Sequence, residues 1–207
     1  MQTIVSPPVH SEDEHAIVAL LSDESTKQAV AIQGQLLQMF GEAIWLQQPP
    51  ALHITLMEII CDTEYKNLSR QEHFAQWYES YNQIAKETLA GFSPFDITFD
   101  RLIVSQRAII IKAADTKPLN DIRERLLSEI RLPEGTKIPP DITHCSLARF
   151  TRPIDLENAI HSARDISVNF VEHVTRFAIV KDLGPPDFNG IPMQTYPLSL
   201  EPTVKPF

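Results

Sequence analysis

The chain has 207 residues, of which 43% are hydrophobic, and its formal net charge is −9. Its length suits one sizeable core or two small lobes, and because it shows no long apolar run and no signal-peptide pattern, we expect a cytoplasmic protein that does not span a membrane. The acidic balance argues against a protein that coats long nucleic acid, because Lys and Arg supply most of that affinity, but it is compatible with a small pocket for one phosphate.

The first part of the chain predicts strands and helices that prolines and glycines separate. A Pro pair interrupts the apolar residues of 43–60, and Gly41 and Gly91 suit helix C-termini. The predicted elements are an irregular segment over 1–14, a buried strand over 15–21, a helix over 26–41, two strands within 43–60 and a helix over about 64–90.

The second part predicts the same kinds of element. β-Branched residues in short alternating runs indicate two strands that join near Ser105, and Pro118 suits the first turn of the helix that follows. The predicted elements are two strands within 95–113, a helix over 117–131, a strand over 139–150, a short helix over 154–164 and closing strands over 170–183 and 193–200.

A weak repeat relates these two parts. An apolar strand, a helix, a Pro-Pro pair and a histidine follow one another in each. Ala16 precedes His53 by 37 positions (16 to 53), and Ala108 precedes His144 by 36 (108 to 144). The near-equal intervals predict a pseudo-twofold fold in which two equivalent units face each other.

Two short motifs occupy matching places in this repeat, "HITL" at 53–56 and "HCSL" at 144–147. Successive side chains of a strand point to opposite faces. Each strand therefore buries its aliphatic or thiol residues and presents an imidazole and a hydroxyl together on the other face. If a pseudo-dyad relates the two units, both pairs converge on one groove: His53 with Thr55, and His144 with Ser146.

Cleavage of a phosphodiester bond gives this quartet a chemical use. The reaction needs a base, an acid and donors to the non-bridging oxygens. Two imidazoles can supply the base and the acid near neutral pH, and two hydroxyls can supply the donors. We therefore take His53 and His144 as candidate catalytic residues, and Thr55 and Ser146 as candidate phosphate-binding residues.

Structural explanations compete with this hypothesis. A single H-x-[ST] motif is more often structural, and it is the second copy at a matching place that favours function. Neither motif brings a third histidine or a carboxylate to the same face, so we expect no metal and no cofactor. We interpret Arg123, Arg125 and Arg131 as one solvated helix face, and the two cysteines as buried thiols. The remaining histidines are interpreted as surface or structural residues: His10, His15, His73, His161 and His173.

Two H-x-[ST]-x motifs separated by 91 positions (53 to 144) resemble those of the two-histidine phosphoesterase superfamily, which includes 2′-5′ RNA ligase-like proteins and cyclic phosphodiesterases. The resemblance covers most of the chain, from near Ile17 to near Tyr196. It implies an α+β fold of one bilobal domain over 1–207, in which two antiparallel sheets line a groove and helices lie outside. It also implies metal-independent action on 2′,3′-cyclic phosphates or 2′-5′ linkages in RNA-derived substrates.

The sequence departs from the family pattern at Ser146, where Thr is frequent. Arg149 is a candidate substrate-binding residue, although a regular strand would place it on the face of Cys145, so it needs a twist or a bulge to reach a phosphate. Family members hold a base with groove aromatics, and the candidates are Phe150, Tyr196 and Trp45, each of which also suits a core.

We therefore predict a monomeric phosphodiesterase whose partner is a small nucleotide or an RNA end. The same four residues would serve an RNA-end ligase or a 2′-5′ oligonucleotide hydrolase. A non-catalytic module that holds a phosphorylated nucleotide or RNA end is the alternative from another class. The pseudo-symmetry leaves open which histidine is the base and which is the acid.

Overall fold

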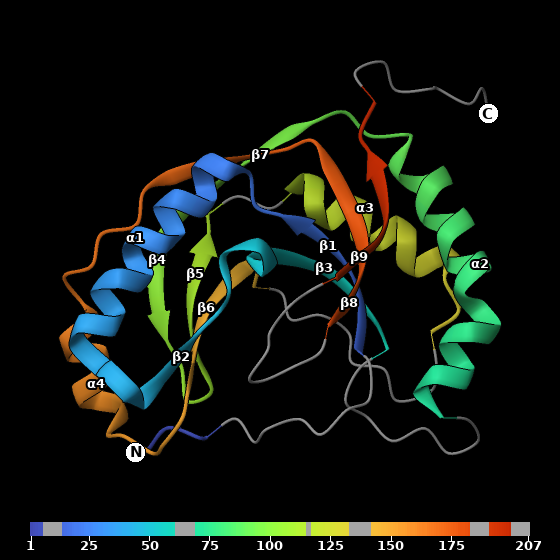
Figure 1. Ribbon diagram of the computed structural model, residues 1–207. Coiled ribbons are helices and arrows are strands. Elements are labelled where there is room, and N and C mark those ends of the chain that lie inside the picture. The colour runs from blue at the N-terminus through green and yellow to red at the C-terminus, as the bar shows by residue number, and fades with distance from the viewer. Residues whose placement is uncertain (6–13, 61–68, 115–116, 133–141, 183–190, 200–207) are drawn as a thin grey trace.

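Helices flank the sheet in this computed structural model, which describes residues 1–5, 14–60, 69–114, 117–132, 142–182 and 191–199 (Figure 1). The helices and 3-10 turns of these ranges are α1 (Asp23–Phe40), η1 (Gly41–Ala43), η2 (Pro49–Ala51), α2 (Arg70–Leu89), α3 (Lys117–Glu129) and α4 (Leu156–Ala163). Each α-helix falls where the sequence predicts one; of the range predicted for the second, 64–68 lie outside the described residues. Within the described ranges, no helix combines the length and apolarity that crossing a bilayer demands.

The strands form one curled antiparallel sheet (Figure 1). They are β1 (Glu14–Leu20), β2 (Ile44–Leu46), β3 (His53–Ile60), β4 (Phe95–Val104), β5 (Ala108–Ala113), β6 (His144–Phe150), β7 (Phe170–Val174), β8 (Arg176–Asp182) and β9 (Ile191–Pro197). Their order is β7-β4-β5-β6-β3-β1-β8-β9, and β2 pairs with the outer part of β6. This confirms the expected α+β class with antiparallel pairing.

The strand order has the expected pseudo-twofold symmetry. We call β3-β1-β8-β9 the first half and β6-β5-β4-β7 the second half; they meet where β3 pairs with β6. Ala16 lies opposite Glu58 of β3, and Ala108 lies opposite Arg149 of β6, so the alignment of Ala16 with Ala108 in the sequence is also the structural one. Hydrogen bonding across β3 and β6 makes the two expected sheets continuous.

One expected strand is two. Residues 170–183 read as a single strand because their apolar and β-branched residues run almost without interruption. In the structure β7 ends at Val174 and β8 begins at Arg176; β7 pairs with β4 in the second half and β8 with β1 in the first. The chain therefore passes from one half to the other at Thr175, a change of neighbour that leaves no mark in the local pattern.

Helix α1 follows β1 of the first half but is anchored on the second. Ser22 caps the helix by accepting from Ser25 N at 3.3 Å, and Ser25 Oγ donates to Val171 O of β7 at 3.3 Å. The carboxylate of Glu172, only 2% exposed, accepts from Ser22 N at 3.0 Å and Ser22 Oγ at 2.9 Å. Ser22 thus satisfies a buried charge and fixes where α1 starts. At its other end Gly41 has φ +51°, as its predicted helix-terminating role requires.

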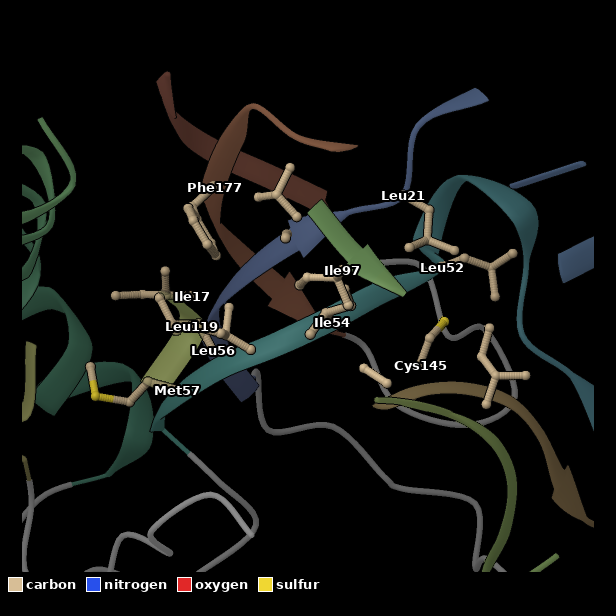
Figure 2. Close-up of a cluster of buried hydrophobic side chains, with 14 of the residues drawn as sticks. Ile17, Leu21, Leu52, Ile54, Leu56, Met57, Ile97, Leu119, Cys145 and Phe177 are labelled. Carbon is tan, nitrogen blue, oxygen red and sulfur yellow. The ribbon is translucent and has the colours of Figure 1, made fainter. Parts of the chain in front are cut away.

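The main core packs against one face of the sheet. Figure 2 shows how side chains from both halves and from α3 meet there. Ile54 of β3 and Cys145 of β6 are both fully buried in it. Those that Figure 2 labels are Ile17, Leu21, Leu52, Ile54, Leu56, Met57, Ile97, Leu119, Cys145 and Phe177. The N-terminal segment expected to be irregular lies mostly outside the described residues, but Gln2 forms a bridge with Asp155.

Candidate active site

The two motif strands pair antiparallel at Ile54 and Cys145, the central residue of each H-x-[ST] motif. Paired residues share a face, and both of these lie in the core. The residues on either side of each therefore point to the opposite face, which we call the histidine face. All four are half-buried, as a site open to a ligand requires: His53, Thr55, His144 and Ser146.

The antiparallel pairing decides which of the four are neighbours. His53 precedes Ile54, and Ser146 follows Cys145, so these two lie toward the same end of the pair. Thr55 and His144 lie toward the other end. Each imidazole therefore has a hydroxyl of its own strand and a hydroxyl of the other strand close by, as the expected convergence of the two motifs requires.

The two imidazoles are held in the same way. His53 Nδ1 donates to Ala51 O at 2.7 Å, and His144 Nδ1 donates to Ile142 O at 2.9 Å. A carbonyl oxygen can only accept, so each Nδ1 carries a proton in both charge states of the ring. Each imidazole must therefore gain or lose its proton at Nε2. Two rings fixed in one tautomer suit an acid and a base acting on the same substrate.

Each motif strand carries a bulge directly after its hydroxyl residue. One extra residue, Leu56 in β3 and Leu147 in β6, has no opposite number in the neighbouring strand. A bulge of this kind shifts the alternation of faces by one residue. The pairs that define the bulges are Ile17 with Met57 and Val18 with Thr55, then Ile109 with Ala148 and Ile110 with Ser146.

The bulges bring a charged side chain of each strand to the histidine face. Arg149 pairs with Ala108, which lies two residues before the partner of Ser146 in β5, so Arg149 and Ser146 share a face. Glu58 pairs with Ala16, which lies two residues before the partner of Thr55 in β1, so Glu58 and Thr55 also share a face. Both side chains are half-buried, whereas the residues at the bulges are buried. A regular strand would have turned Arg149 to the core. The bulge that its candidate role needed is therefore present, and Glu58 occupies the equivalent place in the first half.

Neighbouring strands add two residues that sequence reasoning missed or only suggested. Lys112 of β5 lies directly opposite His144, where the first half has Leu20 opposite His53. Trp45 of β2 lies opposite Arg149 and therefore shares the histidine face. The repeat itself could have found Lys112, because aligning Ala16 with Ala108 aligns Leu20 with Lys112. Nothing local marks either position.

The other two aromatic candidates lie in the core. Phe150 is fully buried and pairs with Ile44, on the face away from the histidines. Tyr196 is 3% exposed, and its hydroxyl donates to Asn82 of α2 at 2.8 Å. Burial raises the pKa of this phenol far above its usual range. Both rings therefore serve packing, and Trp45 is the aromatic candidate that faces the histidines.

The Cys145 thiol, which lies between the candidate residues His144 and Ser146 of β6, is inert. Burial raises the pKa of Cys145 to about 12, so it stays protonated and cannot act as a nucleophile. No three His, Cys, Asp or Glu side chains gather as a metal site would require anywhere in the residues that the structure describes.

Arg123 of α3 corrects one expectation. The sequence suggested a solvated side chain, but Arg123 is only 8% exposed. Its Nε donates to Leu56 O, the carbonyl of the first bulge, at 2.9 Å, and its Nη1 donates to Asn120 at 2.9 Å. The spacing of the helix arginines gave no sign that one of them turns inward.

Solved structures of other proteins have the same fold as this chain. One solved structure with the same fold, TT0787 of Thermus thermophilus, is 16% identical, with a TM-score of 0.64 over 89% of this chain and 97% of that one. Another, LigT of E. coli complexed with 3′-AMP, is 14% identical, with a TM-score of 0.62 over 91% and 99% of the two chains. No curated protein matched the sequence.

The family is decided by the sequence of residues 50–185, which matches the 2′-5′ RNA ligase superfamily. This range contains both motifs and both bulges. The two histidines, their hydroxyl neighbours and the antiparallel sheet that pairs them are what the resemblance to two-histidine phosphoesterases implied. The chain belongs to the 2′-5′ RNA ligase superfamily.

Proposed function

We propose that the chain is a metal-independent phosphodiesterase acting on a 2′,3′-cyclic phosphate or a 2′-5′ linkage of a nucleotide or RNA end. The observation that carries the proposal is the matched pair of imidazoles, each bonded through Nδ1 to a backbone carbonyl two residues earlier and each beside a hydroxyl. Membership of the 2′-5′ RNA ligase superfamily supports the substrate class.

The quartet can carry out hydrolysis without further groups. As a water oxygen attacks phosphorus, one imidazole takes a proton from that water at Nε2. The other imidazole gives its Nε2 proton to the ribose oxygen whose bond to phosphorus breaks. The products are a phosphomonoester and a free hydroxyl, and exchange with solvent restores both rings. Thr55 and Ser146 donate to the non-bridging oxygens, and Arg149 supplies a positive charge on the same face.

Two alternatives use the same residues. In a ligase, a ribose hydroxyl of a second RNA end would replace water as the attacking group. In a binding module, the site would hold a phosphorylated end and leave it unchanged. A catalytic role is favoured over a binding module because proton transfer needs two fixed imidazoles, whereas a module that only holds phosphate needs cations and hydroxyls.

Turnover of small substrates tests the proposal. Nucleoside 2′,3′-cyclic phosphates and a 2′-5′ dinucleotide should yield phosphomonoester products detectable by phosphorus NMR, with a 3′-5′ dinucleotide as the comparison. The control is the protein with both His53→Ala and His144→Ala. Binding of 3′-AMP without turnover of any substrate would favour the binding module. If the protein neither bound 3′-AMP nor turned over any substrate, the proposal would be overturned altogether.

A further inference from the structure

Two buried polar side chains lie on the core side of the motif strands and contact the two bulges. Gln33 of α1 is 3% exposed, and its Nε2 donates to Leu147 O at 2.9 Å and to Gln47 O at 2.8 Å. Arg123 of α3 donates through Nε to Leu56 O at 2.9 Å. Leu56 and Leu147 are the extra residues of the two bulges.

The carbonyl oxygens of the two extra residues lie within the core, where each accepts a hydrogen bond from a buried side chain. Leu147 O also accepts from Gln47 N at 2.9 Å, which ties the segment after β2 to the same point. The side chains of Gln33 and Arg123 therefore favour the bulged form of each strand over a regular one.

Gln33 and Arg123, which we call the braces, each connect one half of the sheet to a helix of the other repeat unit. Helix α1 connects β1 to β2 and β3 in the first unit, yet Gln33 bonds to β6 of the second. Helix α3 connects β5 to β6 in the second unit, yet Arg123 bonds to β3 of the first. Each motif strand is thus held by the helix of the other unit, and the crossing fixes one motif relative to the other.

We propose that Gln33 and Arg123 are positioning residues, each of which holds the bulge that keeps one charged side chain on the histidine face. Gln33 acts through Leu147 on Arg149, and Arg123 acts through Leu56 on Glu58. The consequence for catalysis rests on the proposed function. Neither brace touches the substrate, because both approach the sheet from the core side.

The first arm of the test does not require turnover. Gln33→Leu should speed amide hydrogen exchange of the β6 peptide that contains Leu147 and Arg149, while peptides of β4 and β8 keep their rates. The control is Tyr81→Phe, which removes part-buried hydrogen bonds between the Tyr81 hydroxyl of α2 and both His73 Nε2 at 2.8 Å and Arg131 O at 3.1 Å. Exchange in β6 no faster than in this control would overturn the brace.

The second arm is a double-mutant cycle on a 2′,3′-cyclic nucleotide. Gln33→Leu and Arg149→Gln should each raise KM by between about 10- and 100-fold, as loss of a positioned contact does. Because both remove the same positioned guanidinium, the double variant should be no worse than the poorer single one. Multiplying effects, or an unchanged KM in folded Gln33→Leu, would overturn the positioning role. Tyr81→Phe combined with Arg149→Gln should act independently.

Conservative variants keep the proposal testable if a brace proves essential for folding. Gln33→Asn retains the amide but shortens its reach, and Arg123→Lys retains a cationic donor toward Leu56 O. Arg123→Lys should restore slow exchange in the β3 peptide relative to Arg123→Met. If the wild-type protein turned over no substrate, the proposed function would fail, whereas the exchange measurements would still decide whether the braces hold the bulges.

Discussion

The two halves of the sheet have similar backbone arrangements around their motifs but differ in the charged side chains that they present. In each, a histidine bonded to a backbone carbonyl is followed by a hydroxyl two residues later and by a bulge. Beside these repeated features the second half carries Lys112 and Arg149. The first half carries Leu20 and Glu58 at the equivalent places.

In the proposed mechanism, this difference in charge assigns proton transfer to the two imidazoles and substrate orientation to the charged residues. A symmetric pair of imidazoles can exchange the roles of base and acid, so the quartet by itself sets no direction for a substrate. Opposite charges at equivalent positions do set one, because an anionic substrate gains near Arg149 and Lys112 and loses near Glu58. Replacing one residue of each matched pair therefore tests how far the symmetry extends.

The largest effect is expected from the histidines, where the halves are most alike. A positioned acid or base contributes about 10²–10⁴ in rate, so His53→Ala and His144→Ala should each lower kcat by that factor. Because both act on one transition state, the double variant should be little worse than the poorer single one. Steady-state kinetics, with folding checked by circular dichroism, measure this. Near-normal turnover in either single variant would contradict the two-histidine mechanism.

The pH dependence of the rate separates the roles that symmetry hides. One ring must start neutral and the other protonated, so the rate should fall on both sides of an optimum. The acid limb reports protonation of the base, and the alkaline limb reports deprotonation of the acid. Each histidine variant should lose one limb, and the limb that is lost identifies the role. Loss of the same limb in both variants would mean that the two rings do not act separately as acid and base.

A smaller effect is expected from the hydroxyls. A hydrogen bond to a charged group is worth roughly 1.5–3 kcal/mol, or about 10- to 150-fold in rate. Thr55→Ala and Ser146→Ala should therefore each cost less than the loss of a histidine. Thr55→Ser and Ser146→Thr keep the donor and serve as controls. A hydroxyl variant as damaging as a histidine variant would reverse the ranking and point to a role beyond phosphate binding.

The charged pair should respond in opposite directions. Arg149→Gln removes a favourable charge and should raise KM for an anionic nucleotide. Glu58→Gln removes an unfavourable one and should lower KM by roughly 2- to 5-fold, the size expected for a partly solvated charge several ångströms away. Both changes should shrink as salt is added. Equal shifts of the same sign would show that the two halves do not orient the substrate by charge.

Much of the architecture follows from patterns that are local in the sequence. Helices were predictable from caps and periodicity, and the quartet from the alternation of faces in two strands that recur at matching intervals. The repeat predicted two equivalent units, whereas the pairing of β3 with β6 that joins them into one sheet was not predicted. The single strand expected over 170–183 was wrong because the chain changes neighbours at Thr175, and that change depends on the sheet as a whole.

The remainder of the site depends on long-range contacts. The alternation rule turns Arg149 and Glu58 to the core, and only the extra residues Leu56 and Leu147 reverse that. Those bulges become visible through their registers with β1 and β5. The sequence predicts Arg123 as one of several solvated helix arginines, because nothing in its own helix indicates that it donates a hydrogen bond to Leu56 O of β3. The sequence motif therefore identifies the candidate catalytic residues but not the contacts that position their neighbours.

The smallest effect, none, is expected from removing metal ions. In the proposed mechanism each half provides an imidazole for proton transfer and a hydroxyl for the phosphate, so neither half would depend on a Lewis acid. Turnover of a 2′,3′-cyclic nucleotide should therefore be the same before and after prolonged dialysis against EDTA. The control is a metal-dependent phosphodiesterase treated in parallel, which should lose its activity. A loss of turnover that zinc or manganese restores would indicate that an imidazole binds a metal ion. It would contradict the proposal that the two halves supply an acid and a base.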